Sequence, residues 1–285
     1  HIQCVKEIGD YIMNETPANE NKLRLIDRLS IAITSPKNYD ELVKLSTGKV
    51  VTYMILISFL LAFIEFGINA ITYVARIGGF ENLILNSMPK FTYQDGTLDM
   101  EDEFSMDVGS ATIYVNTDYT DITLDDINSD GIYIAFGSSN VIMGLKSAGM
   151  QYTYFDYKLS DLFWGDFDNQ GLSTMVPQFY MYIIFVALFV MVSKAVKILF
   201  LALVFTIIAR PLAMRFNTGY EFAQVYKICI FGQTLSFLLT AVNTTAGYII
   251  GPSLMTFITL IISFVYINRA IMSKANISDI PPGSL

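Results

Sequence analysis

Three long apolar runs limit the folds open to this chain more than any other part of its sequence. They lie near residues 50–73, 177–209 and 228–267. A helix of about 20 apolar residues is long enough to cross the hydrocarbon of a bilayer. Only 15% of the 285 residues are charged, whereas soluble domains carry about 25%. The apolar runs and the deficit of charge together predict a membrane α-helical bundle.

The number of spans depends on the run 177–209, which is either one long helix or two short ones divided at Lys194 and Lys197. Two helices would have only about 16 and 12 residues, which is less than the usual crossing length. With one helix, five bases share the side of Lys44 and Lys49, as cytoplasmic bases should; they are Arg210, Arg215, Lys227, Arg269 and Lys274. We therefore predict four spans in the cell membrane with both termini cytoplasmic, and five spans as the alternative.

The segment 77–176 differs from the rest of the chain. It holds 16 Asp and Glu but only 3 Lys, a net charge of −13, while all other residues together have a net charge of +5. Short runs of Thr, Tyr, Ile and Val are punctuated by Gly, Asn, Ser and Asp, which is typical of antiparallel strands; we expect strands at 91–94, 111–116, 131–136, 141–145 and 151–155, with a hairpin connection over 136–140. We predict a β-rich extracytoplasmic domain inserted between spans one and two. Nucleic acid is excluded as its partner, because phosphate would be repelled.

The helix expected at 22–34 places basic residues beside a row of apolar ones. It either lies on the membrane surface or packs against the cytoplasmic ends of the spans. Ser35 and Pro36 predict the start of the next short helix. The full domain plan has a polar N-terminal tail over 1–20, cytoplasmic or interfacial amphipathic helices over 21–49, the first transmembrane span over 50–76, the acidic domain over 77–176, spans two to four over 177–272, and a cytoplasmic C-terminal tail over 273–285.

One acidic residue, Glu65, lies inside the first apolar run. If the 177–209 run is a single antiparallel helix, Lys194 and Lys197 come to a similar depth in the membrane. We predict an intramembrane ion pair between Glu65 and Lys194 or Lys197, because ionisable groups in spans usually face the protein interior and often mark function. The favoured alternative is structural: the pair sets the register of the helices, or the lysines extend to a membrane face.

A polar stripe follows the third predicted span. Gln233, Ser236, Thr240 and Asn243 are three or four residues apart and share one face of a helix. The functional interpretation is a polar path for a solute. We favour interhelical hydrogen bonding, for which small polar residues are common in membrane bundles.

A local match to a calcium loop begins at Asp126. Asp126, Asn128 and Asp130 supply oxygen ligands at positions one, three and five, and Gly131 occupies position six. Gly137 stands at position twelve, where a bidentate Glu belongs. Ordinary turn sequence is therefore the favoured interpretation, with a calcium site as the alternative, and no other cofactor is expected.

Residues for catalysis are scarce. The only histidine is His1, and the sequence contains no nucleophile elbow, phosphate loop, dinucleotide fingerprint or zinc motif. We therefore expect a protein that is not an enzyme: a bilayer-embedded accessory or sensory protein whose outward domain binds a ligand or another membrane or envelope protein. The alternative is a component of a transporter or channel that uses the Glu65–lysine pair and the polar stripe.

Several short motifs resemble those of a known family. They are Pro36, Tyr39, Gly48 and Lys49 before the first span, Tyr53 inside it, Phe91-x-x-x-Asp95-Gly96, and Val115-Asn116-Thr117-Asp118. The chain resembles, over about residues 22–272, an uncharacterised family of multispan membrane proteins from bacteria, mostly Gram-positive. Some members are labelled maltodextrin-utilisation proteins, and the family is distantly similar to the Yip class. The resemblance implies no agreed catalytic residues.

Overall fold

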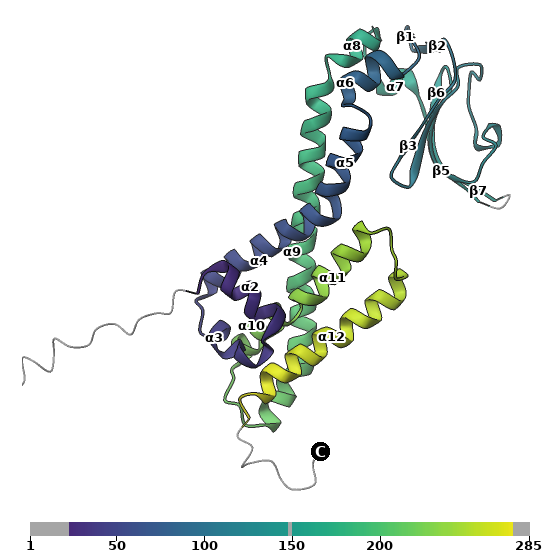
Figure 1. Cartoon of the computed structure of the whole chain (residues 1–285). Coiled ribbons are helices and arrows are strands. Elements are labelled where there is room, and N and C mark those ends of the chain that lie inside the picture. Colours follow the sequence, from purple (N-terminus) through teal and green to yellow (C-terminus); the bar gives the residue numbers. More distant parts are fainter. Residues whose placement is uncertain (1–22, 148–149, 276–285) are drawn as a thin grey trace, which may run out of the picture. The chain divides into compact units, whose positions relative to one another are not determined.

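The computed structural model describes residues 23–147 and 150–275, and for residues 151–154 it describes the backbone alone. These residues form two compact units: a helical unit, with residues up to 69 and from 187 onward, and a sheet unit, with residues 70–186 (Figure 1). The predicted polar tail over 1–20 lies outside the described residues, and so does the predicted C-terminal tail from residue 276 onward.

Four helices in the described residues are long and apolar enough to cross a membrane. They are Thr47–Arg76, Val176–Arg215, Phe222–Thr245 and Pro252–Met272. The second, α9 (Val176–Arg215), runs unbroken through both lysines of the apolar run. This agrees with one long helix in that run rather than two short ones.

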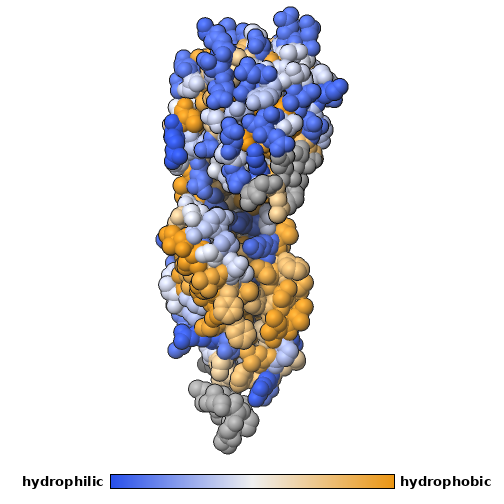
Figure 2. Space-filling view, turned by 90° about the vertical axis from the view of Figure 1, so that its right-hand side faces the viewer, coloured by the Kyte–Doolittle hydropathy of each residue, from blue (hydrophilic) through white to orange (hydrophobic). Residues whose placement is uncertain are grey.

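The apolar side chains of α9 mostly point away from the protein. Phe185, Phe189 and Phe200 are 61%, 75% and 63% exposed. Apolar surface of this extent is unfavourable in water but favourable in hydrocarbon. On the face drawn in Figure 2, apolar surface gathers on the helical unit and polar surface on the sheet unit. The helical unit has the surface of a membrane protein.

The first long helix is composite. It consists of α4 (Thr47–Ala62), the π-helical turn η2 (Phe63–Gly67) and α5 (Ile68–Arg76). A π turn inserts one extra residue, which displaces backbone carbonyls from the regular hydrogen-bond ladder, and such turns are frequent at functional sites. Glu65 lies in this turn.

The third long helix is interrupted at Gln233, between α10 (Phe222–Gly232) and α11 (Thr234–Thr245). Gln233, the first residue of the predicted stripe, lies at this interruption, and Ser236, Thr240 and Asn243 follow within α11. Gly232 permits close packing here, because a Cβ at this position would lie 2.7 Å from Cγ1 of Ile267 in α12 (Pro252–Met272). The Tyr39 hydroxyl donates to the Ala32 carbonyl (2.7 Å) and lies 3.4 Å from the Phe231 carbonyl, and Tyr53 Oη pairs with the Thr234 hydroxyl (2.8 Å), so two buried tyrosines lie beside the interruption.

The N-terminal helices pack into the helical core. They are α2 (Leu25–Thr34), the 3₁₀ turn η1 (Pro36–Asn38) and α3 (Tyr39–Val43). Ala32, Tyr39 and Leu42 are fully buried in the cluster that also contains residues of α4, α9, α10 and α12. One face of the helix over 25–34 thus packs against the spans, while Leu25 and Ile26 stay exposed, so a position at the membrane surface stays a prediction.

Two sheets form the centre of the sheet unit, in the orders β2-β1-β8 and β3-β4-β5-β6-β7. The strands are β1 (Phe91–Gln94), β2 (Thr97–Met100), β3 (Phe104–Val108), β4 (Ala111–Val115), β5 (Gly131–Phe136), β6 (Asn140–Ser147), β7 (Met150–Lys158) and β8 (Phe167–Asp168). Short helical segments accompany them: α6 (Phe80–Asn82), the π turn η3 (Leu83–Ser87), the 3₁₀ turn η4 (Leu124–Asp126), α7 (Leu159–Leu162) and α8 (Asn169–Ser173). All five predicted strands are present, and the hairpin over 136–140 joins β5 to β6 as predicted.

The expectation of antiparallel strands is wrong at one pair. β4 and β5 are parallel, with Ile113 opposite Ile134. Parallel neighbours need a long crossover connection rather than a tight turn, and residues 116–130 provide it, including η4.

Candidate functional site

The sheet unit contains an apolar cavity of about 480 Å³. Its wall is assembled from both sheets, from α6, α7, α8 and η3, and from the first turn of α9. The lining side chains are Phe80, Leu83, Ile84, Met88, Phe91, Tyr93, Leu98, Met100, Met106, Ile113, Val115, Phe136, Leu159, Phe163, Phe167, Leu172, Met175 and Phe179. Cavities of this size and character are typical of sites for small apolar ligands.

Strand alternation builds part of this wall. Phe91 and Tyr93 on β1 and Leu98 and Met100 on β2 are buried, while their neighbours in the strands are exposed. The tight turn between the two strands is Asp95-Gly96, and both residues have positive φ (52° and 83°). This is the geometry that Asp-Gly hairpins favour, and it keeps the four side chains on one face.

Asn169 fastens three segments around the cavity. Its Oδ1 accepts from the Phe91 backbone N–H (2.9 Å), and its Nδ2 donates to the carbonyls of Ile84 (2.9 Å) and Pro89 (3.1 Å). Both polar atoms of the Asn169 side chain are therefore hydrogen-bonded to backbone groups. Asn169 stabilises the segments that form the wall and is not itself one of the lining residues.

The hydroxyl of Tyr93 is the single polar group among the lining side chains, and it already forms a hydrogen bond within the protein. Its hydroxyl donates to the Phe163 carbonyl at 3.3 Å. Burial, and then the charge of Asp166, raise the pKa of Tyr93, so the phenol stays neutral at physiological pH. The cavity offers an apolar ligand an apolar wall, and its lining side chains include no nucleophile or general base.

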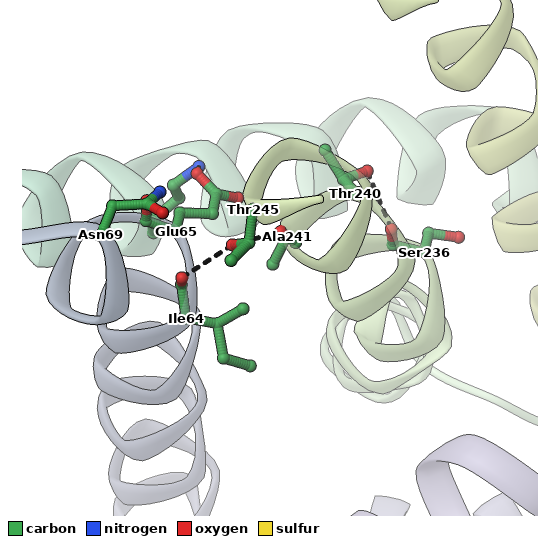
Figure 3. A network of polar contacts seen from close by, with 8 residues as sticks. Ile64, Glu65, Asn69, Ser236, Thr240, Ala241 and Thr245 are labelled. Atoms are coloured by element: carbon green, nitrogen blue, oxygen red, sulfur yellow. Dashed lines mark hydrogen bonds and ion pairs between the residues drawn. The ribbon is translucent and has the colours of Figure 1, made fainter. Parts of the chain in front are cut away.

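The helical unit holds the predicted ion pair. Lys194 Nζ donates to Glu65 Oε2, and the side chains are 17% and 14% exposed, respectively. Around them, the Glu65 carbonyl accepts from Asn69 Nδ2 at 2.8 Å, and the Ile64 carbonyl accepts from Thr245 Oγ1 at 2.7 Å (Figure 3). The carbonyls of the π turn thus find side-chain partners, and the pair links α9 to that turn.

Lys197 does not join this pair. Its ammonium lies 5.9 Å from the ring centroid of Phe237, within cation–π range. Lys197 instead lines a second cavity, of about 270 Å³, together with Gln233, Ser236 and Thr240 from the predicted stripe.

The stripe residues have different partners. Ser236 bridges α11 and α12 by donating to the Thr259 carbonyl (2.8 Å), as interhelical bonding predicts, and Thr240 donates to the Ser236 carbonyl of its own helix (2.9 Å; Figure 3). Asn243 stands apart from the cavity: its amide exchanges two hydrogen bonds with the backbone of Ile250 (2.8 and 2.9 Å). Gln233 donates to the Cys229 carbonyl (2.8 Å).

The candidate calcium residues lie in and after η4. Asp126 Oδ2 accepts from both the backbone N–H (2.8 Å) and the hydroxyl (2.7 Å) of Thr123, so it caps its own turn as ordinary turn sequence would. Asn128 and Asp130 follow in the loop before β5. Within the described ranges, no three His, Cys, Asp or Glu side chains gather as metal ligands.

The apolar cavity was not anticipated from the sequence. The alternating burial of residues 91–100 is readable in the printed letters, but the cavity needs partners from segments that are up to about 80 positions away. The second cavity was partly anticipated, since three stripe residues and one lysine line it.

A protein-family model described as "Protein of unknown function (DUF1189)" matches residues 26–271 of this chain. No curated protein and no solved structure matches it significantly. The match covers both units, including the ion pair and both cavities.

Proposed function

We propose that this chain, which belongs to the family described as "Protein of unknown function (DUF1189)", is a non-enzymatic accessory or sensory membrane protein whose sheet unit binds an apolar ligand. The observation that carries the proposal is the cavity of about 480 Å³, whose lining is apolar except for one phenol that is already hydrogen-bonded. A ligand of this kind would be held by burial of apolar surface, worth about 25 cal/mol per Å².

The ligand class follows from the lining and from the charge of the unit. Eighteen lining side chains without a free polar group favour an acyl chain or a comparable hydrocarbon. The acidic residues of 77–176, with a net charge of −13, disfavour an anionic headgroup. A neutral or cationic amphiphile therefore suits the site better than a fatty acid.

The proposed topology has both termini in the cytoplasm and the sheet unit outside. Contacts among the basic residues support one common side for the helix ends: Lys274 pairs with Asp40, Tyr220 also donates to Asp40, and Arg210 donates to the Tyr220 carbonyl. Lys227 reaches the carbonyls of Val43 (3.1 Å) and Leu45 (2.6 Å). Bases at the ends of three long helices thus gather around α3, as the positive-inside rule expects of a cytoplasmic face.

Side-specific labelling tests this topology. Single cysteines at Gly109 and at Asn217, in a background with Cys4→Ser and Cys229→Ala, are exposed to a membrane-impermeant maleimide in intact cells. We expect labelling of the cysteine at 109 and protection of the cysteine at 217 until the cells are opened. The reverse pattern would place the sheet unit in the cytoplasm.

Energy transfer from the single tryptophan tests ligand binding. Trp164 is 93% exposed and follows Phe163, whose side chain lines the cavity. The full-length protein in nanodiscs is titrated with a dansyl-labelled dodecyl chain that has no charged headgroup. We expect saturable transfer from Trp164.

A variant whose cavity is filled by larger side chains is the matched comparison for the wild type in this titration. Leu98→Phe, Ile113→Phe and Val115→Phe together enlarge three lining side chains, and they should weaken binding about tenfold or more, since displaced contacts of this size are worth at least ~1.4 kcal/mol. Val108→Phe adds the same ring at a partly exposed strand position outside the lining and should change nothing. Equal saturable transfer in the filled variant, or non-saturable transfer in all three proteins, would refute ligand binding in this cavity.

A second candidate function is a transporter or channel component. The observation in its favour is the cavity of about 270 Å³ beside the interruption of the third long helix, where Lys197, Gln233 and Ser236 join apolar side chains in the wall. Interrupted helices often form the substrate sites of transporters. Solute flux into liposomes that contain the purified protein distinguishes this function from an accessory role.

A further inference from the structure

The five-stranded sheet of β3 to β7 has one face that is apolar from edge to edge (Figure 1). Successive side chains of a strand point to opposite faces, and the strand register aligns those of one face into rows. One row crosses all five strands and consists of Met106, Ile113, Ile134, Met143 and Phe155. Among the side chains that the structure describes on this face, none is charged, although the segment 77–176 has a net charge of −13.

The two faces of this sheet are covered to different degrees. The crossover between β4 and β5 packs on the opposite face, where Ala135 and Ile142 are 0% and 2% exposed. On the apolar face, five large side chains are between 39% and 49% exposed: Val108, Ile132, Met143, Phe155 and Tyr157. The described residues therefore cover the apolar face only in part.

A groove of about 250 Å³ lies on the open part of the apolar face. Met143, Phe155 and Tyr157 form part of its wall, and the rings of Phe155 and Tyr157 are stacked with their centroids 5.9 Å apart. Phe136 and Phe163 line both this groove and the cavity of about 480 Å³. The groove and the cavity are therefore neighbours that share two aromatic side chains.

The groove is too small to be a separate site for a small molecule. Pockets of that kind measure about 300–1,000 Å³, and the groove lies below this range. The neighbouring cavity of about 480 Å³ lies within it. The sizes favour a groove that extends the cavity and holds a second part of the same ligand.

A protein partner suits this face less well than a hydrocarbon chain does. Even if each of the five side chains had the ~150–250 Å² of an aromatic one, their exposed fractions would present only about 500 Å². One side of a stable protein interface buries about 800 Å². Apolar patches of the smaller size are nevertheless often functional, and a chain as narrow as an acyl group needs no more surface than this.

We propose that the ligand of the sheet unit is a two-chained lipid without net negative charge, such as a diacylglycerol. One acyl chain occupies the cavity, and the second lies in the groove against Met143 and Phe155. This inference rests on the proposed function, because it takes the cavity as the site of an acyl chain. The second chain covers apolar side chains of the protein that otherwise face water, which favours the complex even for a lipid drawn from the bilayer.

Protection of matched cysteines tests the two-chained ligand. Met106→Cys lies in the wall of the cavity and Met143→Cys in the wall of the groove. Each is introduced with Cys4→Ser and Cys229→Ala into the full-length protein, in nanodiscs of phosphatidylglycerol, whose anionic headgroup the acidic unit disfavours. A maleimide then reacts with each cysteine in the presence of a monoacylglycerol or a diacylglycerol of the same chain length.

At a lipid concentration about ten times its dissociation constant, a covered cysteine should react about tenfold more slowly. We expect the diacylglycerol to slow the cysteines at 106 and 143 alike, and the monoacylglycerol to slow only the cysteine at 106. Ser105→Cys, which neighbours Met106 in β3 and points to the opposite face, is the control, and neither lipid should change its rate.

Failure of this inference and failure of the proposed function give different results. If the diacylglycerol protects position 106 but not 143, or if the monoacylglycerol protects both equally, the groove holds no second chain and the cavity remains an acyl-chain site. If neither lipid protects position 106, the cavity itself is not such a site and both proposals fall.

A cysteine at 143 that is unreactive without added lipid would also overturn the inference, because another surface would then cover the groove. Thermal unfolding of each variant shows whether the fold is kept. If Met143→Cys lowers the unfolding temperature, Phe155→Cys reports on the same groove.

Discussion

Lys194 donates to the carboxylate of Glu65, although 129 positions separate the two residues in the chain. The pair joins the middle of α9 to the π-helical turn of the first long helix. A lone charge in hydrocarbon raises the free energy of membrane insertion by about 2.5–3.5 kcal/mol. In a membrane, the opposite charges of Glu65 and Lys194 would reduce this cost for each other. The pair thereby specifies which part of α9 lies beside the turn.

Removing the carboxylate should destabilise the helical unit. Glu65→Gln leaves the partly buried Lys194 without a counter-charge, and we expect a loss of about 3 kcal/mol, the lower end for broken buried pairs. Cys229 is buried in the core of the helical unit, so its reaction with a thiol-reactive dye on heating reports unfolding once Cys4 is replaced by Ser.

A second substitution tests whether the unpaired charge of Lys194 causes the loss of stability. Lys194→Met added to Glu65→Gln should restore most of the lost stability, because neither charge then remains. An equal or larger loss in the double variant would mean that the side chains matter for packing and not as a pair.

The hydroxyl of Tyr53 should contribute to the stability of the helical unit. Tyr53→Phe keeps the ring, whose centroid lies 4.7 Å from that of Phe231, and removes the bond to the Thr234 hydroxyl. We expect a loss of about 1 kcal/mol. Tyr226→Phe removes a bond from an exposed hydroxyl (3.2 Å) and should cost less. If both substitutions cost the same in the Cys229 assay, Tyr53 does not hold the helix interruption.

Acid should weaken the cluster around Asp40. Burial alone would raise the pKa of Asp40, but hydrogen bonds from Lys274 and Tyr220 and the charges of Lys274 and Lys44 together hold the pKa below its ordinary value. A carboxylate with a depressed folded-state pKa stabilises the fold above its unfolded pKa of about 3.9, and this contribution is lost as the pH falls through the folded pKa.

The Asp40 contribution is small because Lys274 is 42% exposed. We expect about 0.5–1 kcal/mol, measured by thermal unfolding followed by circular dichroism at neutral pH and below pH 4. Asp40→Asn should be less stable than the wild type at neutral pH and similar to it in acid. A difference that stays constant across this range would contradict a role for the carboxylate charge.

Gly96 should be intolerant of a side chain. Its φ of +83° is strained for any other residue, and a Cβ would lie 3.1 Å from Cβ of Ser160. Gly96→Ala should destabilise the sheet unit by about 1–2 kcal/mol, visible in Trp164 fluorescence on denaturation. Gly48→Ala, in α4 with nothing within 4 Å of the new methyl, should instead stabilise its helix by about 0.5–1 kcal/mol.

The helices and most strands could be predicted because their patterns are local. Long apolar runs mark the four long helices, and the alternation at 91–94 and 131–136 marks β1 and β5 at their observed bounds. The strands β2, β3 and β8 escaped prediction. Asp99 lies inside β2, and Glu101, Asp102 and Glu103 lie between β2 and β3, so charged residues interrupt these two short patterns, while β8 has only two residues.

The features that remained hidden depend on distant contacts. Gly232 packs against Ile267 beside the interruption at Gln233, and the parallel β4–β5 pair requires a crossover whose path no local pattern reveals. The ion pair was predictable because charges are so rare in the apolar runs that few pairings exist. The maltodextrin label and the similarity to the Yip class stay predictions.

Native mass spectrometry of the protein released from its own membrane tests the central claim, an apolar ligand in the sheet unit, most directly. We predict that the wild type retains one additional acyl-chain molecule compared with the variant carrying Leu98→Phe, Ile113→Phe and Val115→Phe, and that Val108→Phe retains it as the wild type does. Identical adducts on the wild type and the filled variant would contradict the account.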